Sequence, residues 1–144
     1  MMVEDGRAAW REEHRRAVEV RAEADRARRA AETGQARELV TAFVREAERR
    51  GLPVVALTAV APTGARYRTG LTGWYVDVNL TRAVSPAGEF YLLTVPTSWR
   101  ARLTGVTVEP REPRLVVGEG GRDGESMPLR QLLDRRLDAG TRWP

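Results

Sequence analysis

The spacing of apolar residues changes along the chain, and each spacing predicts a different kind of element. Between residues 35 and 50 the apolar positions recur every three or four residues, at Leu39, Val40, Phe43, Val44 and Ala47. This spacing places them on one face of an amphipathic helix, so we expect this core helix to pack on the body of the protein. Gly51 and Pro53 follow directly and predict its end.

Residues 1–34 are also rich in Ala, Arg and Glu and contain no Pro, which favours a helix. Their apolar residues fit a seven-residue register, with Trp10, Ala17, Ala24 and Ala31 at one seam position and Glu13, Val20 and Ala27 at the other. Such a seam is typical of a helix that pairs with another helix, although alanine buries little surface. We predict a charged helical arm over 1–34. A solvated helix that lies on its own domain is the alternative, with Thr33-Gly34 as a break or a bend.

From Leu52 to Val117 the pattern changes to short runs with strand character. The runs that predict strands are Val54–Val60, Ala65–Thr69, Gly73–Thr81, Glu89–Val95, Arg102–Val108 and Arg114–Val117. Pro62-Thr63-Gly64 and Ser85-Pro86-Ala87-Gly88 supply turns between them. No helical segment separates the runs, so we expect them to form an antiparallel sheet of four to six strands.

The alternation within Gly73–Thr81 and Glu89–Val95 suggests a register for their hairpin. If Val84 faces Glu89, then Leu80 faces Leu93 and Val78 faces Val95. One face of the hairpin then carries only apolar residues, namely Trp74, Val76, Val78, Leu80, Tyr91, Leu93 and Val95. We predict this register because a slip of one residue moves side chains to the other face.

A second apolar stripe, formed by Leu129, Leu132, Leu133 and Leu137, predicts a closing helix from Met127 to about Ala139. Gly140 is a suitable stop. The fold class is therefore α+β: an N-terminal helical arm and core helix, an antiparallel sheet and a C-terminal helix. We divide the chain into the arm, residues 1–34, and a single α+β domain, residues 35–144.

Composition excludes several chemistries. The chain of 144 residues contains no cysteine and one histidine, His14, which excludes thiolate chemistry and a multi-histidine metal site within one chain. All 24 basic residues are arginine, a usage typical of a GC-rich genome. The arm nearly balances its charges, because residues 1–50 hold 12 arginines and 11 acids. No apolar run is long enough for a membrane span, and the acidic start does not resemble a secretory signal, so we expect a cytoplasmic protein.

The glycine-rich stretch Gly118–Ser126 precedes the closing helix and raises the question of an anion or metal site. Ser126 would cap the helix, and Arg122 would assist an anion, whereas Asp123 and Glu125 would repel it or hold a divalent ion. The spacing matches neither a phosphate-binding P-loop nor a calcium loop. We interpret the stretch as a turn and a helix cap, and we expect no cofactor.

Arginines beside aromatic residues suggest nucleic-acid binding, in the segments Arg66-Tyr67-Arg68 and Trp99-Arg100-Ala101-Arg102. In a strand, however, neighbouring side chains point to opposite faces, so the arginines and the aromatic rings would not share a surface. His14 lies among charged residues of the arm, where a solvated histidine is expected. Asp77 could be a carboxylate in a cleft with Glu89 as its acid/base partner, although such residues more often line the wetter face of a sheet.

The leading hypothesis is a non-catalytic cytoplasmic interaction module. Its arm would pair with a second copy or dock to a partner protein through Trp10, Ala17, Val20, Ala24 and Ala27. The second hypothesis is weak nucleic-acid binding through Arg66, Arg68, Arg100 and Arg102. The third is a small ligand-binding protein or enzyme that uses the Gly118–Ser126 loop and Asp77.

Overall fold

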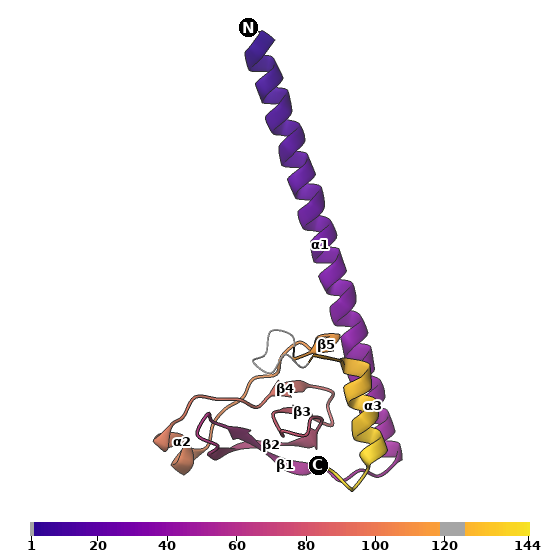
Figure 1. Cartoon of the computed structure of the whole chain (residues 1–144), viewed down its shortest axis with the longest axis vertical. Helices are drawn as coiled ribbons and strands as arrows, with labels where there is room; N and C mark the ends of the chain where they lie inside the picture. The colour runs from indigo at the N-terminus through magenta and orange to yellow at the C-terminus, as the bar shows by residue number, and fades with distance from the viewer. Residues whose placement is uncertain (1, 119–125) are drawn as a thin grey trace.

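The computed structural model describes residues 2–118 and 126–144, with side chains from residue 4 onward, and shows an α+β protein with a long projecting helix (Figure 1). The predicted fold class is confirmed. Within the described residues, no helix combines the length and the apolar character needed to cross a bilayer.

Helix α1 spans Met2–Arg49 and is continuous through Thr33-Gly34, so this dipeptide does not divide it. Glu4 and Asp5 lie in its first turn, where negative charge is favourable. Its end is a Schellman motif: the N–H of Leu52 donates to the carbonyl of Ala47 and the N–H of Gly51 donates to that of Glu48. Gly51 takes a φ of 68°, which glycine adopts without strain, and this explains the predicted stop.

The C-terminal part of α1 packs on the body as the sequence predicts. Ala36, Val40, Phe43, Val44 and Ala47 are all buried. They form one core cluster with the sheet residues Trp74, Val76 and Val84 and with Leu129, Leu132 and Leu133 of helix α3 (Leu129–Ala139). Helix α3 lies alongside this part of α1 in Figure 1, and Gly140 ends it, as predicted.

The main sheet has four antiparallel strands in the order of the chain: β1 (Val55–Val60), β2 (Arg66–Tyr75), β3 (Arg82–Val84) and β4 (Phe90–Leu92). Just beyond β4, Thr94 forms a parallel bridge with Val60 of β1. The N–H of Val60 donates to Leu93 and the N–H of Val95 donates back to Val60. The segment just after β4 therefore lies beside β1, and a second core cluster gathers around Leu57, Tyr91 and Leu93.

The hairpin register predicted from alternation is wrong by one residue. Val84 pairs with Phe90 rather than Glu89, and Arg82 pairs with Leu92. The strand Gly73–Thr81 is also wrong, because β2 ends at Tyr75 and the chain turns at once. The Asp77 carboxylate accepts the N–H groups of Thr81 and Arg82, which fixes this turn.

The turn separates the residues that were predicted to form one apolar face. Val78 is 66% exposed and Leu80 adopts a positive φ, so neither continues a strand. Trp74 and Val76 are buried against α1, whereas Tyr91 and Leu93 are buried in the second cluster. The predicted face is therefore divided between two cores.

Two further predictions at the end of the chain need correction. Residues Trp99–Thr104 form a short helix, α2, whose N-cap Ser98 accepts the N–H of Ala101, so Arg102–Val108 is not a strand. Ser126 does not cap α3, because Pro128 occupies the N-cap position without a side-chain cap. Met127–Pro128 instead forms β6, paired with β5 (Val116–Val117).

Candidate functional site

The part of α1 beyond the body is the largest feature that the core does not use. No residue from Glu4 to Gln35 is buried, and Ala36 is the first buried residue of the helix. At about 1.5 Å per residue, this segment extends for about 48 Å, and Figure 1 shows it projecting from the body rather than lying on it. The segment is solvated, as the alternative expected, but it does not lie on its own domain.

The predicted contact residues Trp10, Ala17, Val20, Ala24 and Ala27 all lie on this exposed segment. Trp10 and Val20 are each 65% exposed, although both are large apolar side chains. Because the helix is continuous, a seven-residue spacing keeps these five residues along one strip of its surface. We call this strip the α1 seam.

Continuity also fixes where the α1 seam lies relative to the body. Ala27 and Phe43 are separated by sixteen residues of one helix, which at about 100° per residue places them about 160° apart around the axis. Phe43 is buried against the body, so the seam near Ala27 faces away from it. A partner helix can therefore approach this part of the seam without meeting the sheet.

Local interactions maintain the projecting helix. The Trp10 and His14 rings stack one turn apart, with centroids separated by 5.3 Å. Glu12 lies 3.5 Å from Arg16 and 3.7 Å from Arg15 in exposed ion pairs that each contribute well under about 1 kcal/mol. His14 is thus accounted for by a stacking contact, with no nucleophile beside it among the residues described.

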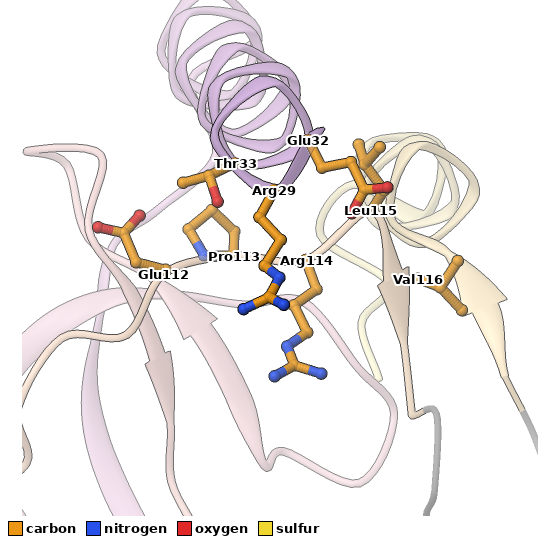
Figure 2. Close-up of a pocket in the computed structure, with 8 residues that line it drawn as sticks. All are labelled: Arg29, Glu32, Thr33, Glu112, Pro113, Arg114, Leu115 and Val116. Carbon is orange, nitrogen blue, oxygen red and sulfur yellow. The ribbon is translucent and has the colours of Figure 1, made fainter. Parts of the chain in front are cut away.

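A pocket of about 710 Å³ lies where α1 leaves the body (Figure 2). Arg29 of α1 and Arg114 extend toward the same side of it, with Glu112 at one edge. The Glu112 carboxylate already has a partner, because Nε of Arg37 donates a hydrogen bond to it over 2.8 Å. This bond lowers the pKa of the Glu112 carboxyl. Neither Arg29 nor Arg114 has an ion pair within the described part of the chain.

No sequence pattern predicted this pocket, because Arg29 and Arg114 are brought together only by the fold. The strand β5, at its edge, leads into residues 119–125, which include Glu119, Asp123 and Glu125. These carboxylates are close in sequence to Arg114 but far from Arg29, and we assign the pocket no ligand.

The four arginines predicted to contact nucleic acid lie on two elements that pack against each other, Arg66 and Arg68 on β2 and Arg100 and Arg102 on α2. The Arg66 guanidinium donates to the carbonyls of Asn79 and Leu80, and that of Arg68 donates to Leu103. Arg66 and Arg68 are exposed while Tyr67 between them is buried, as alternation predicts. These two arginines hold segments of the body together.

The second pair differs from its prediction. Arg100 and Arg102 lie on helix α2, and Trp99 beside them is 74% exposed rather than buried under them. Leu103, one turn from Trp99, is 69% exposed. This patch was not predicted from the sequence, because a strand was expected here. Ser98 was the available sequence signal for a helix, because serine is a favoured N-cap residue. Its side chain accepts the N–H of Ala101, three residues later.

The carboxylate Asp77 has a structural role. It is 6% exposed, accepts two backbone N–H groups and the hydroxyl of Thr81, and lies 3.2 Å from the Arg82 guanidinium. Glu89 accepts a 2.6 Å hydrogen bond from Tyr91 instead of facing Asp77 as a catalytic partner.

The candidate anion or metal loop lies mostly outside the described residues, since Arg122, Asp123 and Glu125 fall within 119–125. Ser126, the one member described, is exposed. Among residues 2–118 and 126–144, no three His, Asp or Glu side chains gather in a group able to hold a metal ion. Searches against protein-family models, curated proteins and solved structures found no match for the chain.

Proposed function

We propose that this protein is a non-catalytic interaction module that binds a helix of another protein molecule through the α1 seam. The supporting observation is the exposure of Trp10 and Val20 on a helix that projects from the body. Pairing would bury these side chains, and burial of apolar surface is favourable by about 25 cal/mol per Å². The body would serve as the anchor that holds the helix in place.

The interior of the protein is consistent with an anchoring role. The core cluster joins α1, the sheet and α3, so the projecting segment continues from a helix that is fixed along its C-terminal part. Because the core fixes one end of the helix, the projecting residues keep a defined position relative to the body. Tertiary packing also supports such a helix more than an isolated helix is supported by its own propensity. Asp77 is the one buried carboxylate in the described residues. It accepts two backbone N–H groups of its turn and so has a structural role.

The test uses two exposed valines on different faces of the same turn. Val20 belongs to the α1 seam, whereas Val18 is 53% exposed but lies about 160° away around the axis. A photo-reactive side chain is introduced at each position of the full chain in its native cells. We expect a covalent adduct of defined mass from position 20 and much less from position 18.

The same variants are examined as purified protein by light scattering behind a sizing column, together with a chain that starts at Gln35. A dimer that the truncation dissociates would identify a second copy as the partner. Equal adducts at both valines, or none at either in a monomeric protein, would refute binding through the seam.

A second candidate function, nucleic-acid binding, is favoured by the patch on α2. Trp99 is exposed on the same short helix as Arg100 and Arg102, so a stacked base and neighbouring phosphates could share this surface. The test is binding to single-stranded oligonucleotides at increasing salt, with Trp99→Ala and Arg100→Ala/Arg102→Ala compared with Trp10→Ala. Unchanged binding in the α2 variants, or no binding at low salt, would eliminate this role.

A further inference from the structure

We infer that the helix that fits the α1 seam is not a second copy of this chain but an amphipathic helix whose apolar seam is flanked by aspartate and glutamate. This inference rests on the proposed function and concerns the identity of the partner. It follows from the charges of the residues beside the seam. The composition of the arm and the exposure of its side chains do not by themselves show which charges lie there.

The residues beside a helical seam determine which partner helix binds, because they contact the corresponding residues of the other helix. In the register set by Trp10 and Val20, the charged flanking residues are Arg7, Arg16, Arg21, Arg28 and Glu23. All five are exposed on the projecting segment. The near-neutral arm thus presents four positive charges and one negative charge beside its seam, Glu13 lies within the seam, and the remaining acids lie elsewhere on the helix.

A parallel pair of identical chains brings like charges together. Each flanking residue meets the flanking residue of the next heptad on the other chain, so Arg16 faces Arg21 of the second copy, and this contact occurs twice. Glu13 occupies the seam itself and would face its own equivalent. Glu23 would face Arg28, and this attractive contact also occurs twice, so the flanking charges of a parallel pair give no net attraction.

An antiparallel pair is no better. In that arrangement the residues on one flank meet the same flank of the other chain. One flank carries Arg7, His14, Arg21 and Arg28, with no acid among them, whereas the other carries Arg16 and Glu23, which would attract each other. The mostly alanine seam buries too little apolar surface to outweigh such repulsion easily, since each alanine contributes only a single methyl group.

The internal ion pairs of α1 leave these arginines available. Arg16 lies 3.5 Å from Glu12 and Arg28 lies 3.8 Å from Asp25, at distances beyond a good hydrogen bond and with all four side chains at least half exposed. Arg7 and Arg21 have no ion pair within the described residues. An incoming helix with carboxylates at its flanks would therefore meet the arginines with favourable charge and the seam with apolar side chains.

The test titrates the full chain, at low ionic strength, with synthetic helical peptides of about 28 residues, or four heptads. The peptides share one leucine and isoleucine seam and differ only at the flanking positions, which are all glutamate, all glutamine or all lysine. Calorimetry measures affinity, and light scattering measures the mass of the chain alone. We expect a monomer that binds the glutamate peptide about tenfold more tightly than the glutamine peptide.

Three variants make the result specific to the seam. Val20→Asp should abolish binding of the glutamate peptide, and the matched Val18→Asp should retain it. Arg16→Glu/Arg21→Glu should reverse the preference toward the lysine peptide. Preserved far-UV circular dichroism is required of each variant, because all four substituted positions are exposed and outside the core.

The outcomes separate this inference from the proposed function. A dimer that Val20→Asp dissociates would overturn the acidic partner and leave binding through the seam intact. Equal affinity for all three peptides, sensitive to Val20→Asp, would do the same. A monomer that binds no peptide would overturn both.

Discussion

The ring of Phe43 meets that of Trp74 edge-on, with centroids 5.9 Å apart and planes at 85°, and this contact joins the long helix to the sheet. Both side chains are almost completely buried. The indole N–H of Trp74 also donates to the carbonyl of Leu52, just after the Schellman motif that ends α1. One tryptophan therefore fixes both the face of the helix and the position of its end.

Replacement of this tryptophan should destabilise the body. Trp74→Phe removes the hydrogen bond to Leu52, leaves a buried carbonyl unpaired and opens a cavity, so the free energy of unfolding should fall by about 2–3 kcal/mol. Phe43→Leu, which conserves apolar character, should cost about half as much. Scanning calorimetry measures both. A Trp74→Phe protein as stable as the parent would refute the anchoring role of the indole.

The helices and the antiparallel sheet could be predicted from sequence because their apolar stripes are long. Leu39 to Ala47 and Leu129 to Leu137 each repeat over at least two turns, and a glycine follows each. The heptad register of the arm also comes from the sequence, and it stays a prediction. The side of the helix on which the seam lies relative to the body could not be predicted from the sequence. A break at Gly34 would have left no fixed angle between the seam and the buried face of the core helix.

The hairpin failed for a different reason. The alternation from Trp74 to Leu80 has the period of a strand, but a side-chain carboxylate can replace strand pairing by a turn. Nothing in the alternation itself distinguishes the two outcomes. Likewise α2 has six residues, too few for a periodic pattern, and the pocket between Arg29 and Arg114 joins residues far apart in the chain.

The turn at Asp77 can be tested directly. Asp77→Ala would leave the N–H groups of Thr81 and Arg82 without their acceptor, so we expect a loss of about 2–4 kcal/mol in the free energy of unfolding. Asp77→Asn keeps one side-chain oxygen and should lose less. Asn79→Ala, at an exposed position of the same turn, is the control and should change stability by under about 0.5 kcal/mol. Urea denaturation distinguishes them, and equal effects of the two alanine variants would contradict this account.

Two glycines should respond to alanine in opposite directions. A methyl group at Gly73 would lie 2.3 Å from the carbonyl oxygen of Val84, so Gly73→Ala must displace β2 from β3 and lower the melting temperature. Gly34 lies within α1 and has nothing within 4 Å of the added carbon. Gly34→Ala should increase helix stability by up to about 1 kcal/mol. Thermal unfolding followed by circular dichroism tests the pair, and a stabilising Gly73→Ala would show that the strands can separate without cost.

Tyr91 should make stability fall at high pH. Burial, followed by the hydrogen bond to Glu89 and the nearby carboxylate charges, raises the pKa of its hydroxyl from 10.0 to about 12. The folded protein therefore holds the Tyr91 proton after the unfolded chain has released it. The stabilisation is fully present below pH 10 and is lost as pH rises from about 10 toward 12. The chain has no lysine, so few other groups titrate in this range.

The measurement is urea denaturation of the parent and Tyr91→Phe between pH 8 and pH 11. Phenylalanine lacks the hydroxyl and so lacks its titration, and it also loses the 2.6 Å bond to Glu89. The parent should be the more stable protein at pH 8, and the difference should shrink as pH rises above 10, because only the parent loses a contribution. Parallel stability curves across this range would mean that the Tyr91 hydroxyl titrates alike in the folded and unfolded chains.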